Sequence, residues 1–386
     1  MLIGIVGAPN KGKSRFFSCV SKLDVQVANY PFTTIDPDRA VAYLKVPCPS
    51  KELGIISKPR TGKLEDGMRD VPIQLMDVAG LVPGAHEGNG MGNKFLDDLS
   101  SADGFVHIID ASGKTDLTGQ PAHEFEIEKE VLFLDEELRY WILGILKKNA
   151  PKFKGRTINE LHAVLSGLSY SKNIVLRCAR NCQIDEKRIE ASDTELEKLS
   201  VELSKNAKPK IIVANKADLE GALERAQETA KKLSVEIIPA SAQYEYVLSK
   251  AREKGIIRYA QGEKEFSIIG NPDTTQTAAL EKISKFMKKN NGTGVYTALE
   301  KLVFEKIGMI VVYPVEDENA FSDAAGNVLP DAVLMPKEST VIELAAKVHQ
   351  DLADKFIGAI DAREKRRVAK DHPLKNGDII KIIRGK

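Results

Sequence analysis

The sequence predicts an α/β protein with a mostly parallel sheet, a helical insertion and a separate C-terminal unit in which a β-sheet clasps one helix. Three observations support this fold class. Short apolar runs recur between segments long enough for helices. In one long segment the apolar residues repeat only at helical spacing, and in the last part of the chain short strand-like runs return. With 386 residues, 42% of them hydrophobic, the chain is long enough for two or three domains with sizeable cores.

The apolar runs define the expected sheet. They stand at Leu2 to Val6, Ile73 to Met76, Gly104 to Ile109, Lys210 to Val213 and Val235 to Ile238. Several are apolar throughout, as strands covered on both faces must be, so a mostly parallel sheet is the natural arrangement. Ligands bind in the loops at the carboxyl ends of such strands, and we expect functional residues there.

The segment from about residue 121 to 208 interrupts this pattern. Apolar side chains recur there at helical spacing at Leu134, Leu138, Trp141, Ile142 and Ile145. A second amphipathic helix is predicted over Thr194 to Ala207. The interruption indicates a helical insertion, residues 121–208, within a parallel-sheet domain made of residues 1–120 and 209–305.

The last segment, residues 306–386, changes pattern again. Strands are predicted at Met309 to Tyr313, Ala332 to Met335, Phe356 to Ile360 and Asp378 to Ile383. Thr340 and Glu343 have the spacing of a capping box at the start of a helix. These elements fit a compact β-sheet that clasps one helix.

A phosphate-binding loop follows the first strand, because Gly7 to Ser14 satisfy G-x-x-x-x-G-K-[ST]. Its glycines let consecutive backbone N–H groups turn around the phosphates, Lys13 reaches the β- and γ-oxygens, and Ser14 offers a hydroxyl to Mg²⁺. A plain glycine-containing turn is the alternative, which the flanking strand and helix disfavour. The residues expected to contact nucleotide here are Ala8, Pro9, Asn10, Lys11, Gly12, Lys13, Ser14 and Arg15.

A second motif, D-x-x-G, runs from Asp77 to Gly80 after the next apolar run. A carboxylate at the end of a strand is well placed to hold Mg²⁺ through water. The glycine lets a backbone N–H meet the γ-phosphate. The motif is weak by itself and gains meaning from its position after the phosphate loop.

Two later motifs predict a guanine site. Asn215-Lys216-Ala217-Asp218 follows a strand, and the Asp218 carboxylate can accept two parallel hydrogen bonds from guanine, whereas adenine lacks that pair of donors. Ser241 and Ala242 follow the next strand and supply a backbone contact to the guanine oxygen. Four motifs in this order, each after a predicted strand, indicate a GTP-binding protein.

Two loops resemble the switch regions of the Obg-related GTPases of the TRAFAC class. They are Asn29-Tyr30-Pro31-Phe32-Thr33-Thr34 and the run from Asp77 to Leu96, DVAGLVPGAHEGNGMGNKFL, which is most similar to the YchF branch. The resemblance spans essentially the full length and implies a P-loop NTPase G domain and a C-terminal, ubiquitin-like TGS domain. Branch members with Asn-x-x-Glu as the fourth motif prefer ATP. Asp218 departs from them, which favours GTP and similarity to the archaeal form.

The resemblance also implies roles in hydrolysis for Lys13, Thr34 and His86. Thr34 is expected to ligate Mg²⁺ and to respond to the γ-phosphate, although a threonine pair can also simply begin a strand. Ras-like switches have a water-orienting Gln directly after D-x-x-G, whereas this chain has Leu81, so another group must orient the water. His86, on the glycine-rich loop that follows, is the suspected catalytic residue; a surface His on a mobile loop is the alternative.

Asn10 points to a second ion. Related GTPases with Asn at this loop position hold K⁺ against the phosphates in the place of an arginine finger, and such a cation offsets charge between the β- and γ-phosphates. An ordinary turn asparagine is the alternative. Mg²⁺ is therefore the expected cofactor, and K⁺ a second candidate.

The basic end of the chain indicates a partner. Residues 363–386 hold nine Lys or Arg against three acids, in a chain whose net charge is +1. Such a segment can meet RNA phosphates, and the resemblance implies ribosome or tRNA contact through the TGS domain. A solvated charged face is the alternative.

Four scattered cysteines offer no disulfide framework, and no apolar stretch is long enough for a membrane span, so we expect a cytoplasmic monomer without a membrane partner. The predicted activity is slow, Mg²⁺-dependent hydrolysis of GTP to GDP and phosphate by a ribosome-associated switch. Two other functions stay open: an ATPase of the same fold, and an RNA or protein adaptor for which nucleotide is a structural ligand.

Overall fold

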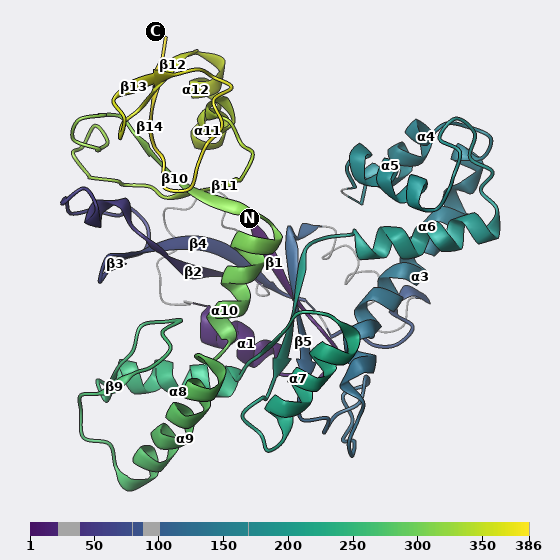
Figure 1. Ribbon diagram of the computed structural model, residues 1–386, viewed down its shortest axis with the longest axis horizontal. Helices are drawn as coiled ribbons and strands as arrows, with labels where there is room; N and C mark the ends of the chain where they lie inside the picture. The colour runs from purple at the N-terminus through teal and green to yellow at the C-terminus, as the bar shows by residue number, and fades with distance from the viewer. Residues whose placement is uncertain (22–38, 79, 88–100, 169, 386) are drawn as a thin grey trace.

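The computed structural model of the chain describes residues 1–21, 39–78, 80–87, 101–168 and 170–385. Its centre is a sheet with the strand order β2-β4-β1-β5-β6-β7, in which β3 also pairs with β4. Figure 1 shows helices on both faces of this sheet, a helical lobe beside it and a β-rich unit beyond β2 and β4. The strands are β1 (Leu2–Val6), β2 (Arg39–Pro47), β3 (Leu64–Glu65), β4 (Met68–Asp77), β5 (Gly104–Asp110), β6 (Lys210–Asn215) and β7 (Ile237–Pro239).

The mostly parallel sheet predicted from the apolar runs is confirmed. Strands β4, β1, β5, β6 and β7 run parallel, whereas β2 and β3 lie antiparallel to β4. The apolar runs do not reveal β2, because this edge strand keeps several partly exposed positions. The carboxyl ends of β1 and β4 lie side by side, with Ile5 opposite Asp77, so the loops that follow both strands meet at one edge.

Helices cover both faces of the sheet, because side chains alternate along each strand. Ile3 and Ile5 belong to a core with α1 (Lys13–Val20), α8 (Ala242–Glu253), α10 (Val295–Glu300) and the π-helical turn Lys301–Lys306. Leu2 and Val6 face the other side, where α3 (Ile127–Phe153) and α7 (Ala222–Leu233) pack. Helix α9 (Thr274–Asn290) packs on α8 beside the hairpin of β8 (Ile257–Arg258) and β9 (Ser267–Ile268).

The predicted helical insertion lies between β5 and β6. It consists of α3, α4 (Ile158–Ser166), α5 (Lys172–Asn181) and α6 (Asp193–Lys205), and the last three begin at Thr157, Ser171 and Ser192 as N-caps. Leu134 and Leu138 of α3 pack against the sheet, whereas Ile142 and Leu146 belong to the insertion's own core. Helix α3 therefore joins the two cores. None of the helices in the described ranges has the length and apolarity that a membrane span needs.

The C-terminal unit is a five-stranded sheet with the order β11-β10-β14-β12-β13. Its elements are β10 (Met309–Val315), β11 (Val333–Pro336), α11 (Val341–Val348), α12 (Gln350–Asp354), β12 (Phe356–Asp361), β13 (Arg366–Val368) and β14 (Ile379–Arg384). Val341 and Leu344 of α11 pack on Ile310 and Val312 of β10. The Thr340 backbone N–H donates to Glu343 Oε2 at 2.7 Å, as the capping-box spacing predicts.

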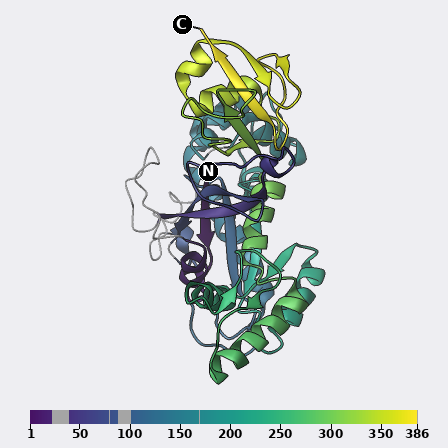
Figure 2. The ribbon, with the colours of Figure 1, turned by 90° about the vertical axis from the view of Figure 1, so that its left-hand side faces the viewer.

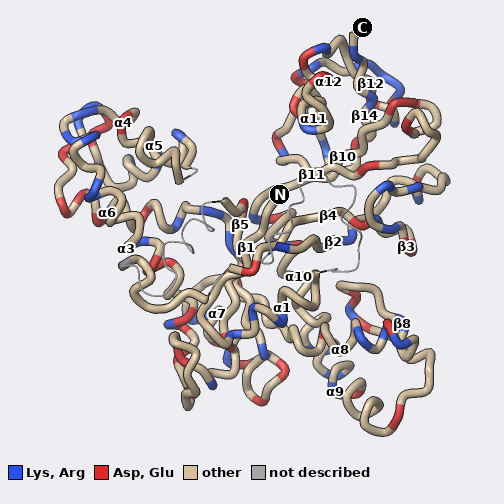
Figure 3. The backbone as a smooth tube through the Cα atoms, turned by 180° about the vertical axis from the view of Figure 1, so that it is seen from behind, with Lys and Arg blue, Asp and Glu red and all other residues tan. Residues whose placement is uncertain are grey.

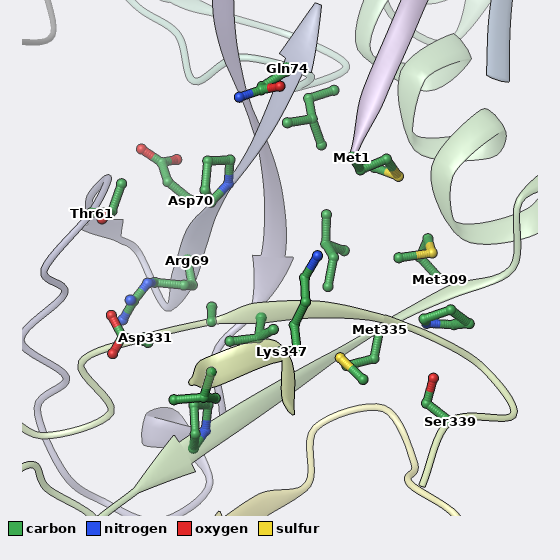
Figure 4. A pocket seen from close by; sticks show the side chains of 18 of the residues that line it. Met1, Thr61, Arg69, Asp70, Gln74, Met309, Asp331, Met335, Ser339 and Lys347 are labelled. Atoms are coloured by element: carbon green, nitrogen blue, oxygen red, sulfur yellow. The ribbon is translucent and has the colours of Figure 1, made fainter. Parts of the chain in front are cut away.

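The C-terminal unit contacts the central sheet through Arg69 of β4. This buried guanidinium donates to the carbonyl oxygens of Leu329 and Pro330 at 2.8 and 2.7 Å. Beside this contact the two units enclose a cleft of about 1240 Å³, in which Arg69 and Asp331 face one another (Figure 4). Figure 2 shows the C-terminal unit and helix α9 at opposite ends of the molecule, so the central sheet separates them.

Candidate functional site

The phosphate loop connects β1 to α1, and neither of its two glycines has room for a side chain. Gly7 has φ +146°, and a Cβ there would lie 2.3 Å from the Ile108 carbonyl oxygen of β5. Gly12 has φ +89°, and a Cβ there would lie 2.3 Å from Asn215 Nδ2 at the end of β6. The loop therefore packs directly on two neighbouring strand ends, which holds its backbone in place.

Lys13 lies across the inside of this loop. Its Nζ atom donates to the Ala8 carbonyl oxygen at 3.0 Å, and the side chain is buried. Burial lowers the pKa of Lys13, while the negative charge of Asp77 opposes that shift. A buried ammonium group beside the backbone of a phosphate loop is suited to an anionic ligand.

Ser14 and Asp77, the predicted magnesium ligands, meet in the structure. Ser14 Oγ donates to Asp77 Oδ2 at 3.2 Å, which joins the start of α1 to the end of β4. A hydroxyl and a carboxylate are hard oxygen donors of the kind that Mg²⁺ binds, directly or through water. The donor set therefore fits that ion. Thr34, the third predicted ligand, lies outside the described residues.

Gly80 brings the second motif close to the phosphate loop. A Cβ at this position would lie 3.4 Å from Lys13 Nζ, and the next backbone N–H, of Leu81, donates to the Gly7 carbonyl oxygen at 3.1 Å. The Leu81 side chain is 1% exposed and packs in the core between the sheet and α3. A leucine buried in that core cannot orient a water molecule.

The fourth motif is tied to the phosphate loop by side chains. Asn215 Nδ2 donates to the Lys11 carbonyl oxygen at 2.9 Å, and Asn215 Oδ1 accepts from the Ala242 backbone N–H at 3.1 Å. Lys216 Nζ donates to the Asn10 carbonyl oxygen at 2.9 Å. Asn215 thus links the phosphate loop to the segment that begins α8.

The remaining predicted base contacts lie beside this link. Asp218 is partly exposed, three residues beyond Asn215 in the chain. Ser241 is buried and caps α8, since its Oγ accepts from the Tyr244 backbone N–H at 3.1 Å. Arg15 stacks on Tyr246 of the same helix, with its Cζ 4.4 Å from the ring centroid.

The Asn10 side chain reaches the loop after β5. Its Nδ2 donates to the Gly119 carbonyl oxygen at 2.9 Å, and the residue has a left-handed φ of 61°, which asparagine tolerates well. Pro9 also contacts this loop, because a Cβ on Gly119 would lie 2.8 Å from Pro9 Cβ. This contact fixes the direction of the Asn10 amide, and the potassium role stays a prediction.

Two buried acids outside the nucleotide-binding motifs, Glu130 and Asp110, support the phosphate loop. Lys11 Nζ lies 2.6 Å from Glu130 Oε1 of α3, and the Asp110 backbone N–H donates to Glu130 Oε2 at 2.8 Å. Burial raises the pKa of Glu130 to about 7, against the opposing charge of Lys11. Burial would also raise the pKa of Asp110, but hydrogen bonds from Lys216, Ser112 and Thr115 leave it lowered. No local pattern marks Glu130, which stands in the helical insertion far along the chain.

His86 lies in a 3₁₀ turn, Ala85–Glu87, that is docked on α3. Its Nδ1 is 2.7 Å from Glu137 Oε2, and its ring stacks on Tyr140 with 4.8 Å between centroids. The backbone N–H groups of Gly84 and His86 donate to the two oxygens of the same Glu137 carboxylate, at 2.9 and 3.2 Å. The suspected catalytic residue is therefore held by the first helix of the insertion, which the sequence does not indicate.

Comparison with known proteins places this geometry in a family. Three family descriptions match successive parts of the chain. They are "50S ribosome-binding GTPase" at residues 2–148, "Obg-like GTPase YGR210-like, G4 motif-containing domain" at 213–317 and "TGS domain" at 325–384.

Full-length relatives agree with these matches. The GTP-binding protein MJ1332 of Methanocaldococcus jannaschii is 46% identical, across 99% of this chain and 98% of its own. The crystal structure of a GTP binding protein from Pyrococcus horikoshii OT3 is 32% identical, covers 100% of both chains and has a TM-score of 0.77. The YchF GTPase of Schizosaccharomyces pombe, at 18% identity, shares the fold with a TM-score of 0.58 over 99% of this chain and 97% of its own.

Proposed function

Because the chain belongs to the YchF-type branch of the Obg-like GTPases and carries a TGS domain, we propose that it binds GTP and hydrolyses it to GDP and phosphate as a Mg²⁺-dependent switch. The meeting of Lys13, Ser14 and Asp77 at the ends of β1 and β4 supports this proposal most directly. On binding, the Lys13 ammonium would exchange the Ala8 carbonyl for the β- and γ-oxygens. Mg²⁺ held by Ser14, Asp77 and Thr34 would offset charge that develops between those phosphates.

The base is proposed to be guanine. Asp218 lies on the loop that Asn215 fixes to the phosphate loop, and Ser241 and Ala242 begin the helix that Asn215 also contacts. A carboxylate at that position accepts from N1–H and the exocyclic amine of guanine, and meets no matching donors on adenine. This chemistry favours GTP over ATP.

The attacking water is proposed to be oriented by His86. Leu81 is excluded from this role by its burial in the core. His86 follows it on a turn whose backbone is held by Glu137, and imidazole both accepts and donates protons near neutral pH. A K⁺ ion at Asn10 is a further proposed accelerator, because Asn10 belongs to the phosphate loop itself.

The partner is proposed to be ribosomal or other RNA, bound through the TGS domain. Figure 3 shows Lys and Arg positions gathered near the C-terminal end of the chain, where Arg366 and Arg367 belong to β13 and Lys381 and Arg384 belong to β14. Arg366 and Lys381 are ion-paired with Glu364 and Glu318, which reduces the free positive charge of the segment. We also propose the division into residues 1–120 with 209–305, 121–208 and 306–386 as the G domain, the helical insertion and the TGS domain.

One experiment tests the activity against its alternatives. Turnover is measured with GTP and ATP, in KCl and in NaCl at equal ionic strength, with and without ribosomes. We expect Mg²⁺-dependent GTP turnover that exceeds ATP turnover, and faster turnover in KCl if Asn10 holds K⁺. Preferred ATP turnover would indicate the ATPase, whereas binding without turnover under every condition would indicate the adaptor.

Ribosome binding has its own test. Co-sedimentation with ribosomes should fall steeply with salt and should be lost in Arg366→Glu/Arg367→Glu, because both side chains are exposed on β13. Lys198→Glu, on the exposed side of α6 in the insertion, is the control for an unrelated charge reversal. Binding that neither salt nor the double substitution changes would remove this patch from the proposal.

A further inference from the structure

We propose that Glu137 of helix α3 is the positioning residue of the hydrolytic site. Its carboxylate holds His86 in a fixed place and determines which ring nitrogen of His86 carries the proton. This inference rests on the proposed hydrolysis of GTP. It assigns a role to a residue outside all four nucleotide-binding motifs, in the segment that forms the helical insertion.

One carboxylate holds the whole turn. Glu137 Oε1 accepts from the Gly84 backbone N–H at 2.9 Å, while Oε2 accepts from the His86 backbone N–H at 3.2 Å and contacts His86 Nδ1 at 2.7 Å. The Glu137 side chain is 8% exposed, so these bonds form largely away from water, where a charged acceptor binds strongly. Both the backbone and the ring of His86 are therefore placed by a single group.

The ring contact determines the tautomer. A carboxylate accepts hydrogen bonds and does not donate them, so the Nδ1 atom of His86 carries the proton in this contact. Stacking on Tyr140 restricts rotation of the ring. His86 would then use Nε2 toward a water or phosphate, in the way that carboxylate-bound histidines act in other sites.

The same helix is anchored to the phosphate loop. Glu130, seven residues before Glu137, forms the buried contact with Lys11 at 2.6 Å. Seven residues are almost two helical turns, so the two carboxylates lie on one side of α3, roughly 10 Å apart along its axis. A turn held by Glu137 therefore has a defined position relative to the phosphate loop, which a surface loop would lack.

A purely structural role is the competing explanation, since two of the three bonds go to the backbone. Two features go beyond it: the short contact to Nδ1 and the stacked ring, neither of which a backbone cap requires. Two readouts of Glu137→Gln separate the two roles, namely the tautomer of His86 and the change of kcat relative to KM. The amide keeps the shape and one acceptor, but it cannot serve all three N–H groups as an anion does.

The test compares Glu137→Gln with Glu136→Gln, a neighbouring exposed acid on the same helix. We expect Glu137→Gln to lower kcat about 10- to 100-fold, which is the usual effect of losing a residue that orients a functional side chain through a hydrogen bond. KM and GDP affinity should stay within about twofold of the wild-type values. Glu136→Gln should match the wild type. In His86→Ala the Glu137→Gln change should have no further effect, because Glu137 acts through His86.

A second measurement does not depend on hydrolysis. ¹⁵N NMR of the histidine-labelled protein, assigned with His86→Ala, should show Nδ1–H for His86 in the wild type and loss of that preference in Glu137→Gln. If the wild type hydrolyses GTP and the two variants, Glu137→Gln and Glu136→Gln, do so at equal rates, the inference is overturned. An unchanged His86 tautomer in Glu137→Gln would overturn it as well. A wild type that never hydrolyses GTP would instead overturn the proposed function, and the tautomer would still decide whether Glu137 holds His86.

Discussion

Lys11 Nζ of the phosphate loop lies 2.6 Å from Glu130 Oε1 of helix α3, and both side chains are buried. The Lys11 ammonium also donates to the carbonyl and hydroxyl oxygens of Thr115, at 2.9 and 2.8 Å. The loop that is to hold the phosphates is thereby fixed to the helix on which the insertion is built. Nucleotide binding and the packing of the insertion should depend on one another.

Loss of the Glu130 carboxylate should destabilise the protein strongly. Glu130→Ala leaves a buried ammonium without its acid partner, which costs about 3–5 kcal/mol of unfolding free energy. Glu128→Ala is the matched control on the same helix, because Glu128 pairs with Lys232 at the surface and should cost about 0–1 kcal/mol. Urea denaturation measures both values. Equal losses for the two variants would contradict the buried contact.

The same group predicts a pH dependence of stability. The pKa of Glu130 rises from 4.5 to about 7 on folding, so between these values the folded state keeps a proton that the unfolded state has released. Its contribution to the free energy of unfolding is therefore fully present below pH 4.5 and is lost as the pH rises through about 7. Between about pH 5 and about pH 8, wild-type stability should fall more than that of Glu130→Gln. Parallel curves for the two proteins would argue against a raised pKa.

Asp218 predicts a change of nucleotide specificity. Asp218→Asn replaces one hydrogen-bond acceptor by a donor. The affinity of the site for guanine should therefore fall, and its affinity for xanthine should rise, because xanthine has an oxygen where guanine has its exocyclic amine. We expect GTP binding to weaken by about 10- to 100-fold, because the amide of the new side chain faces the exocyclic amine of guanine, and two donors cannot form a hydrogen bond with each other. Competition of GTP, XTP and ATP for a fluorescent nucleotide measures the change. Unaltered GTP affinity would place the base elsewhere.

Arg69 predicts the strength of the contact between the central sheet and the C-terminal unit. Its guanidinium donates to Ser57, Leu329 and Pro330, so Arg69→Ala strands buried carbonyl groups and should cost about 2–4 kcal/mol. Arg60→Ala is the control, since Arg60 is 51% exposed in its ion pairs with Asp323 and Asp331 and should cost about 0–1 kcal/mol.

Limited proteolysis reports on the Arg69 contact separately from overall stability. Cleavage near residues 316–332 should speed up in Arg69→Ala and stay at the wild-type rate in Arg60→Ala. Equal cleavage of both variants would show that the contact does not hold the two units together.

Much of the fold could be predicted from local pattern. Each predicted strand of the central sheet and of the C-terminal unit has a counterpart in the structure. In the central sheet the signal is strong because strands buried on both faces are apolar throughout. The edge strands β2 and β13 are not predicted by this pattern. Solvent on one side of such strands permits polar residues, so they lack a continuous apolar run. The helical insertion was visible because its apolar residues repeat at helical spacing.

Lys13, Ser14, Asp77 and Asn215 follow from the sequence by itself, because each stands at a set distance from the end of a parallel strand and such ends meet at one edge. The partners of Lys11 and His86 were decided by tertiary structure. Glu130 and Glu137 look like ordinary polar positions of a long helix, and the packing of α3 on the sheet determines which of its acids are buried. Through these two buried acids, helix α3 supports both the phosphate loop and the turn that carries His86. The spacing of residues along the chain does not reveal this shared support.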